Sequence, residues 1–186
     1  MVVASLSLVA GATAQINVAS TANGGVGTQS SLWTAGATAD RAMDGNRDGR
    51  WSMGSVNHTN AQLNAWINIE FAQDELIDSV FVWNRLDGLQ GRLNPFSVIL
   101  RDAGNNIVWQ SNNNIFVDNI VDGDANTEGM RFDVTPVVAR SVMVQLDQSN
   151  YLHLAELEAY NAVPEPATLA LAGLGLAAVV RRRARK

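Results

Sequence analysis

Hydrophobic and polar residues alternate in short runs between Gln15 and Ala162, and Gly, Asn and Asp bound these runs. No stretch keeps apolar residues at helical spacing for long. Because successive side chains of a strand point to opposite faces, the alternation predicts β-strands that each bury one face. The predicted strands are residues 66–71, 76–84, 96–101, 107–110, 130–134, 141–146 and 152–160, and the polar residues 112–114 and 118–126 predict a long surface loop. Short strands joined by polar turns predict an antiparallel β-sandwich, with any binding function in its end loops.

Both ends of the chain have the composition of processing segments. Residues 1–14 are small and apolar and close with Ala12-Thr13-Ala14, a pattern that a signal peptidase accepts. Residues 167–180 are apolar but fewer than the about 20 that a comfortable membrane span needs. The basic residues within 181–186 are a stop-transfer signal that leaves the preceding domain on the far side of the membrane. The sequence predicts a signal peptide at 1–14, one exported domain at 15–161 and a sorting tail at 162–186 with a short hydrophobic helix.

The order of features in this tail is specific. Pro164-Glu165-Pro166 comes first, then the apolar run, then the basic cluster. The segment resembles the PEP-CTERM sorting signal of Gram-negative bacteria. That resemblance implies recognition by an exosortase-type enzyme, at least transient contact with the membrane, and a place in the cell envelope, at the outer surface or in an exopolysaccharide or biofilm matrix.

The predicted domain is acidic and lacks cysteine. It holds eight of the 13 basic residues and 17 of the 18 acidic ones, a formal charge of −9. Without a basic stripe to neutralise phosphates, such a surface is a poor nucleic-acid binder, whereas divalent cations suit it. The absence of cysteine excludes thiol catalysis and thiolate metal sites.

One loop has the composition of a site for a hard cation. In Asp44-Gly45-Asn46-Arg47-Asp48-Gly49, short oxygen-bearing side chains alternate with turn-forming residues. An EF-hand is excluded, because its spacing places Ser55 where a bidentate Glu is required and no flanking helices are predicted. A solvated turn rich in Asp and Asn is the alternative.

A second group of residues points to sugar recognition. His58, Arg85 and Arg92 would together offer several N–H donors to the hydroxyls and ring oxygen of a sugar. Asp87 lies two residues after Arg85, on the same face of an extended chain, so it can orient the guanidinium and offset its charge. Each residue alone is more simply a surface loop residue, and only their combination favours a site.

The spacing of this group matches a known signature. In F-type lectins, or fucolectins, a His is followed after 26 residues by Arg-x-Asp and, four residues later, by Arg or Lys. His58, Arg85, Asp87 and Arg92 fit this pattern without a gap, and the resemblance extends from Asn17 to Tyr160. It implies an all-β, discoidin-like jelly-roll β-sandwich of the F5/8 type C class, with a structural calcium ion and a fucose-binding pocket.

Carried over by position, the resemblance assigns residues to both sites. Calcium would take the side chains of Asp44, Ser55 and Glu156 and the backbone oxygens of Arg41, Asn46 and Ala155. Fucose would be held by His58, Arg85 and Arg92, with Asp87 as the orienting anion. Trp51, and less favourably Trp33, could form an apolar wall for its methyl group, although either could instead pack in the core. Many members carry adjacent cysteines where this chain has Gly88-Leu89, so Leu89 would supply that apolar contact.

Two alternatives stand beside this interpretation. Glu156 and Glu158 lie on one strand face and could serve a glycosidase, but no acid/base partner or nucleophile motif accompanies them, and His153 is most simply a strand residue. A matrix protein with the same fold and no specific sugar site is the other alternative. The sequence favours a non-catalytic, calcium-stabilised lectin for fucosylated or related glycans.

Overall fold

Two long strands, β3 (Trp66–Asn84) and β6 (Met130–Leu146), organise the fold. The computed structural model describes residues 14–116 and 129–163. Residues Ile16–Ala162 form one unit, and of the remaining residues only 14, 15 and 163 are described. The other elements are η1 (Thr21–Asn23), β1 (Val26–Gln29), η2 (Ala39–Ala42), η3 (Trp51–Met53), β2 (Gln62–Leu63), η4 (Gln90–Leu93), β4 (Phe96–Arg101), β5 (Ile107–Asn114), β7 (Ser149–Asn150) and β8 (Leu154–Asn161), where η denotes a short 3-10 helix. Within the described ranges no helix is long and apolar enough to cross a membrane.

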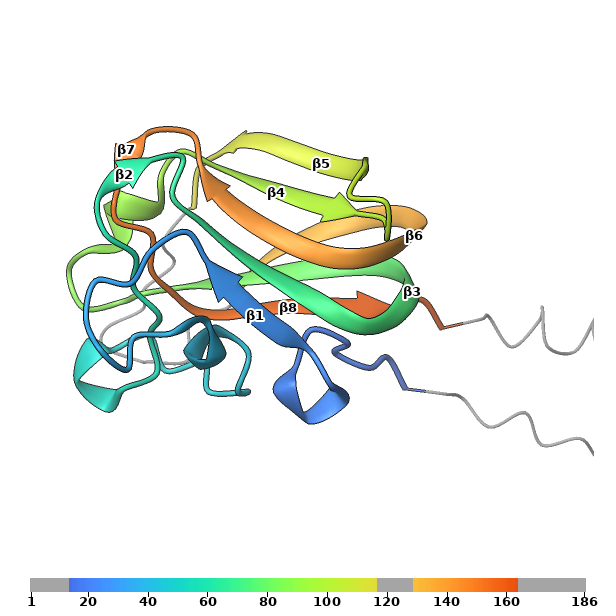
Figure 1. Cartoon of the computed structure of the whole chain (residues 1–186), viewed down its shortest axis with the longest axis horizontal. Helices are drawn as coiled ribbons and strands as arrows, with labels where there is room; N and C mark the ends of the chain where they lie inside the picture. Colours follow the sequence, from blue (N-terminus) through green and yellow to red (C-terminus); the bar gives the residue numbers. More distant parts are fainter. Residues whose placement is uncertain (1–13, 117–128, 164–186) are drawn as a thin grey trace, which may run out of the picture. The chain divides into compact units, whose positions relative to one another are not determined.

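The strands form two layers because β3 and β6 bend. The first part of β3 pairs with β1 and with the last part of β6. That part of β6 also pairs with β4, and β4 pairs with β5. The second part of β3 pairs with the first part of β6 and with β8. Shifts in register between Glu70 and Glu75 and between Ile77 and Ser79 lie where β3 passes from one layer to the other (Figure 1). All these pairs are antiparallel, so the unit is a β-sandwich built around two shared strands.

The core lies between the layers and follows the alternation in the sequence. In β3, Ile67, Ile69 and Phe71 are buried before the bend, and Val80 and Val82 are buried after it. Burial of each such side chain contributes roughly 1.5–3 kcal/mol relative to exposure. The core is completed mainly by Phe96, Val98, Leu100, Val142, Val144, Leu146, Leu152, Leu154 and Leu157.

The predicted strands are largely present, with differences at their ends. β4 has the predicted bounds, while 66–71 and 76–84 join into β3, and 130–134 and 141–146 join into β6. The prediction of a loop at 112–114 is wrong, because β5 runs to Asn114, whose amide donates to Phe96 O at 3.0 Å. Strand β1 was not predicted, since its sequence Val-Gly-Thr-Gln carries almost no apolar signal. Residues 118–126, most of the signal peptide and the tail helix fall outside the described residues.

Strand β8 and the residues just before it form backbone hydrogen bonds with segments at opposite ends of the sandwich. At its end the first residues of the unit pair with it, Val18 N donating to Ala159 O and Asn161 N to Ile16 O. Before its start, the chain pairs with residues 57–59 through Thr59 N to Leu152 O and Asn57 N to Leu154 O. This second pairing fixes the segment that carries His58.

Candidate functional site

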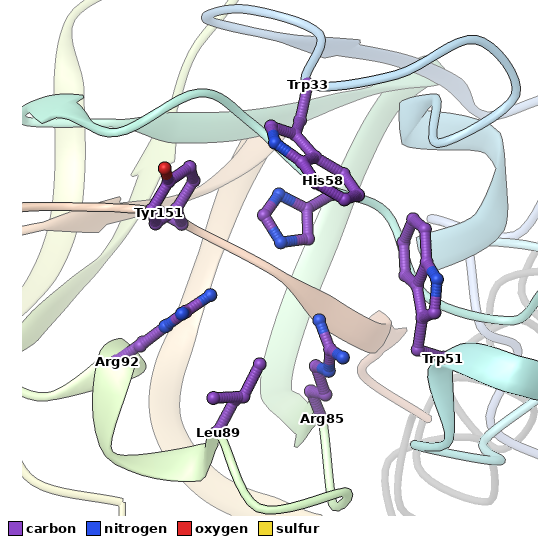
Figure 2. Close-up of a pocket in the computed structure, with 7 residues that line it drawn as sticks. All are labelled: Trp33, Trp51, His58, Arg85, Leu89, Arg92 and Tyr151. Carbon is purple, nitrogen blue, oxygen red and sulfur yellow. The ribbon is translucent and has the colours of Figure 1, made fainter.

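A pocket of about 290 Å³ lies among the loops at the end of the sandwich where β8 begins (Figure 2). This volume is at the small end of the range for small-molecule sites, about 300–1,000 Å³, and suits a ligand of about one sugar unit. Five loop segments contribute to it, so its composition depends on the whole loop arrangement. The lining residues are Trp33, Trp51, His58, Arg85, Leu89, Arg92 and Tyr151.

His58 forms the centre of the pocket and acts as an acceptor. Its ring is buried, and Nδ1 lies 2.8 Å from Thr59 O. Because a carbonyl oxygen can only accept, Nδ1 carries the hydrogen and Nε2 is left as an acceptor. Burial lowers the pKa of His58, and the charges of Arg85 and Arg92 act in the same direction, so the ring is neutral at pH 7. A ligand hydroxyl can therefore donate to Nε2.

Aromatic rings hold this imidazole on several sides. The ring centroids of Trp33, Tyr151 and Trp51 lie 4.7, 5.3 and 5.6 Å from that of His58. Trp33 remains 48% exposed. Both tryptophans thus line the pocket rather than the core, and they provide apolar faces beside the polar groups.

Arg85 follows β3 directly and is oriented by Asp87. Its Nε and Nη2 donate to the two carboxylate oxygens of Asp87, the second at 3.1 Å, and Asp87 Oδ2 also accepts from Trp51 N at 2.9 Å. The Arg85 guanidinium lies over the Trp51 ring at 5.4 Å. Burial alone would raise the pKa of Asp87, but the hydrogen bonds from Arg85 and Trp51 N hold it below its usual value. Asp87 therefore stays ionised and fixes the direction of the Arg85 donors.

Arg92 and Leu89 complete the floor of the pocket. Arg92, from η4, lies over the ring of Tyr151 at 4.9 Å and points across the pocket (Figure 2). Within residues 14–116 and 129–163 its guanidinium makes no ion pair and no hydrogen bond. Leu89 lies between the two arginines, so the residue expected to supply an apolar contact lines the pocket.

The sequence analysis missed two residues of this region. Tyr151 lines the pocket, and His153 lies directly behind His58 with ring centroids 5.2 Å apart. His153 precedes β8, so the expectation of a strand residue is wrong. Its ring is fully buried, neither ring nitrogen has a hydrogen-bond partner among the described residues, and burial lowers its pKa to about 3. The alternation of Tyr151 and His153 with the apolar Leu152 and Leu154 was the available signal, but it did not show that one face lies at a pocket.

The acidic loop is built from successive turns. Asp44 Oδ1 accepts from Asn46 N at 2.8 Å, Asn46 Oδ1 from Asp48 N at 3.1 Å, and Asp48 Oδ1 from Arg50 N at 3.0 Å. These contacts are the turns expected of the alternative interpretation, in which each side chain binds the backbone two residues on. Each of these oxygens has a second lone pair, so the turns do not exclude a cation.

A buried carboxylate closes this loop from the far end of the chain. Glu156, on β8, accepts from Gly45 N at 3.1 Å through Oε1, while its buried Oε2 has no partner in the described structure. Burial raises the pKa of Glu156 to about 8, and the nearby charge of Asp44 also raises it. An unpartnered carboxylate oxygen beside an Asp-rich loop fits a hard cation.

The other expected calcium ligands lie in the same region. Ser55 is buried, and its hydroxyl donates to Asp48 O and Arg50 O. Arg41 and Asn46 flank Asp44 in sequence, and Ala155 precedes Glu156. No three His, Asp or Glu side chains gather in the described residues, so a cation here would need the hydroxyl and backbone oxygens of the expected set.

The acidic loop also supports the pocket. Leu86 N donates to Gly49 O at 2.8 Å, and a Cβ at Gly49 would lie 2.7 Å from Asn84 O. Asn84 and Leu86 flank Arg85, so the loop packs against the backbone that carries this side chain. Any ion that orders the loop would therefore also order Arg85.

Glu158 does not have the surroundings of a catalytic carboxylate. It is 3% exposed and bound by Arg47, whose Nη2 lies 2.6 Å from Oε1, and by Trp83 Nε1 at 3.0 Å. Neither Glu156 nor Glu158 lines the pocket. This arrangement gives no support to the glycosidase alternative.

The geometry can be compared with known proteins. Residues 26–157 match the F5/8 type C domain, which covers most of the described unit. The chain belongs to the F5/8 type C domain family. Residues 162–186 match the PEP-CTERM protein-sorting motif, which indicates export and sorting to the cell surface. The discoidin-like sandwich is the fold expected for this family.

Individual relatives are fucose-binding proteins. Fucolectin-6 of Anguilla japonica is 31% identical over 132 residues, which cover 71% of this chain and 68% of that protein. A Streptococcus pneumoniae fucose binding module has a TM-score of 0.69 and 32% identity, covering 80% of this chain and 96% of the module. The lectin domain of lectinolysin, solved with Lewis B antigen, has a TM-score of 0.67 and 31% identity, covering 79% and 97%. The chain thus shares its fold with a fucose binding module and with a lectin domain that binds Lewis B antigen.

Proposed function

We propose that the protein is an exported, non-catalytic lectin whose pocket binds fucose or a similar deoxy sugar on a glycan. The observation that carries this proposal is the convergence of one acceptor, His58 Nε2, and two guanidiniums, Arg85 and Arg92, inside a small aromatic pocket. A sugar hydroxyl donates one hydrogen and accepts others, so adjacent hydroxyls can bind all three groups at once. The fucose-binding relatives support this choice of sugar.

The apolar side of the pocket suits a deoxy sugar. Trp51, Trp33 and Leu89 line the pocket beside His58 and the two arginines. Their apolar surfaces can contact a methyl group that a fully hydroxylated hexose lacks. Asp87 holds Arg85 in place, which reduces the conformational entropy lost on binding. Among the described residues that line the pocket there is no carboxylate, and Asp87 beside it is bound to Arg85.

A glycan array on the full chain tests the proposal. We expect signals for fucosylated glycans, and we expect Arg85→Ala to weaken them about 100-fold, because it removes charge-assisted hydrogen bonds of about 1.5–3 kcal/mol each. A folded protein without any fucose signal would refute the specificity. Undiminished binding by Arg85→Ala would refute the site.

A structural calcium ion forms the second part of the proposal. Asp44, Ser55 and Glu156 would supply side-chain oxygens, with the backbone oxygens of Arg41, Asn46 and Ala155. The unpartnered Oε2 of Glu156 supports it, because a bound cation would stabilise this buried carboxylate as an anion. EDTA should lower the melting temperature of the wild type and leave Glu156→Gln unchanged. An equal response of the two proteins would contradict calcium binding at this carboxylate.

The destination of the protein completes the proposal. The sorting motif supports processing by an exosortase-type enzyme and display in the envelope or an exopolysaccharide matrix. There the lectin would bind fucosylated or related polysaccharide. The mass of the mature protein from surface fractions tests this: loss of the tail is expected, and an intact tail would contradict processing.

A further inference from the structure

Three exposed apolar residues lie where the chain leaves the sandwich. Leu76 of β3 and Val138 of β6 are directly opposite each other in register, between the two register shifts of β3, so their side chains share one face. Ala162 N donates to Leu76 O at 2.7 Å. The preceding residue, Asn161, donates through N to Ile16 O at 3.2 Å, so Ile16 borders the same end of β8. Each of the three is between 44% and 52% exposed, and we call Ile16, Leu76 and Val138 the end patch.

The end patch lies at the opposite end of the sandwich from the sugar pocket. The pocket is found where β8 begins, whereas the end patch is found where β8 finishes at Asn161 (Figure 1). The strand between them extends over roughly 25 Å, because a strand rises about 3.3 Å per residue. A surface that contacts the end patch therefore leaves the pocket open.

The apolar part of the sorting tail begins a short distance after the end patch. Residues 163–166 connect Ala162, bound to Leu76, with the apolar residues 167–180. Even fully extended, this connection spans at most roughly 18 Å. The headgroup layer of a bilayer takes up roughly 6 Å of that length. While residues 167–180 are in the hydrocarbon, the short connection therefore keeps Leu76 close to the lipid surface.

The charges around the end patch indicate which lipids suit it. Arg140 pairs with Glu70 at 3.4 Å and with Asp74 at 3.6 Å, and Glu75 directly precedes Leu76. Three carboxylates around one guanidinium leave this rim negative, so an anionic bilayer would repel it. A zwitterionic bilayer lacks this repulsion, and it can take up the apolar side chains.

We infer that the end patch rests on a zwitterionic lipid surface while the tail is in the membrane, and that this contact turns the sugar pocket away from the bilayer. The inference rests on the export and sorting of the proposed function, and it adds the orientation in which the lectin is displayed. The end patch orients the domain but does not anchor it, because even a whole myristoyl chain gives only marginal membrane binding. Loss of the tail therefore releases the domain.

Single cysteines on the full chain measure this contact, because the sequence has no cysteine of its own. Val138→Cys places a fluorophore in the end patch. Leu63→Cys places it on β2, where Leu63 is equally exposed and pairs with Ser149 near the pocket. The protein is reconstituted through its tail into vesicles of phosphatidylethanolamine and phosphatidylcholine that contain a lipid-borne quencher. We expect about threefold quenching for Val138→Cys and less than about 1.2-fold for Leu63→Cys.

Lipid composition and a second substitution identify the cause of the quenching. Replacing about a third of the lipid with phosphatidylglycerol should reduce the quenching of Val138→Cys to about 1.5-fold, because the negative rim is repelled. Leu76→Ser, added to Val138→Cys, should reduce it about equally, because it removes apolar area beside the label. Ile115→Ser, just beyond β5, removes an equally exposed apolar side chain outside the end patch and should leave the quenching unchanged.

Flotation and fucoside titration on the same vesicles separate the remaining results. Flotation with equal quenching of the two labels would overturn the contact, and fucoside binding in that sample would leave the sugar site intact. Quenching that follows protein density instead of the lipid-borne quencher would make a second copy the occupant and overturn the inference. Absence of flotation would overturn it together with the membrane role of the tail.

The titration also tests the direction of the pocket. Equal fucoside affinity on vesicles and in detergent would support a pocket that faces away from the bilayer, whereas binding only after detergent release would overturn that orientation. Absence of fucoside binding in both conditions would refute the proposed sugar site, while quenching of Val138→Cys would still support the lipid contact.

Discussion

Two regions of this protein use the same chemistry to different ends. In one, Arg47 lies over Trp83 at 4.4 Å and pairs with Glu158, which also accepts from Trp83 Nε1 and from the hydroxyl of Tyr160. In the other, Arg85 lies over Trp51 and pairs with Asp87. Both are arginines stacked on tryptophan and fixed by a carboxylate.

The difference lies in what remains unpaired. Around Glu158 the donors and acceptors bind one another, and this carboxylate is nearly buried. Around Arg85, the acceptor His58 Nε2 and the donors of the Arg92 guanidinium and the Tyr151 hydroxyl have no hydrogen-bond partner among the described residues. The first region stabilises the fold and the second is available to a ligand. A stacked, paired arginine is therefore not by itself evidence of a binding site.

The largest effect that tests this comparison is expected for Glu158→Ala. We expect it to lower the free energy of unfolding by about 3 kcal/mol, because it leaves the N–H of the half-buried Trp83 unpaired and removes the partner of Arg47. Fucoside affinity of the folded protein should stay within about twofold, since Glu158 does not line the pocket. Chemical denaturation and calorimetry measure the two quantities.

An exposed ion pair provides the matched control. Asp133→Ala removes the partner of Arg131, whose pair is exposed, and should change the free energy of unfolding by less than about 0.5 kcal/mol. If Glu158→Ala were equally mild, or if it abolished sugar binding, the assignment of this cluster to stability would be wrong.

The next largest effect concerns pH and His153, whose ring lies behind that of His58. The pKa of His153 is lowered to about 3 in the folded state, below its unfolded value of 6.5, so the unfolded state binds the proton more readily. Its contribution to stability is present above pH 6.5 and is lost as pH falls toward 3. Between pH 6.5 and 5 the loss should reach about 2 kcal/mol.

A variant isolates this titration. The raised pKa of Glu156 acts in the opposite direction in the metal-free protein, which gains stability from that group as pH falls from 8 toward 4.5. The measurement is therefore the difference in unfolding free energy between the wild type and His153→Leu, with calcium at saturation, at several pH values. A difference independent of pH would contradict the buried neutral state of His153.

A smaller effect is expected for Asp87→Asn. This change keeps the shape of the side chain but removes the charge that fixes Arg85, so fucoside affinity should fall about fivefold. The free energy of unfolding should fall by less than about 1 kcal/mol, because the pair is partly exposed. The reverse pattern, a large loss of stability with unchanged affinity, would place Asp87 with Glu158 as a stabilising residue.

The smallest effect is expected for Leu89→Ala. Leu89 is one of several apolar groups in the pocket, so its truncation should weaken fucoside binding about two- to threefold and leave stability nearly unchanged. A matched titration with a sugar that lacks the methyl group provides the control, since its affinity should be insensitive to Leu89. Equal sensitivity of the two sugars would show that Leu89 does not contact the methyl group.

Much of the fold was accessible from the sequence because alternation is a local signal. The strand predicted at 141–146 was expected to bury one face, and its alternate residues Val142, Val144 and Leu146 are buried together. The strand β4 was predicted with its observed bounds. The sequence did not show that β3 and β6 each bend and serve both layers, because a bend depends on the pairing of distant strands and leaves the local alternation almost unchanged.

The sequence by itself determined which chemical groups could meet a sugar, since His58, Arg85, Asp87 and Arg92 follow a spaced pattern that needs no coordinates. Only the tertiary structure decided which of their atoms remain available. The pairing of residues 57–59 with 152–154 brings Tyr151 and His153 to the site, and no local pattern encodes such a contact. Residue identity supplies hydrogen-bonding capacity, whereas the packing of distant segments determines how much of that capacity is used within the protein.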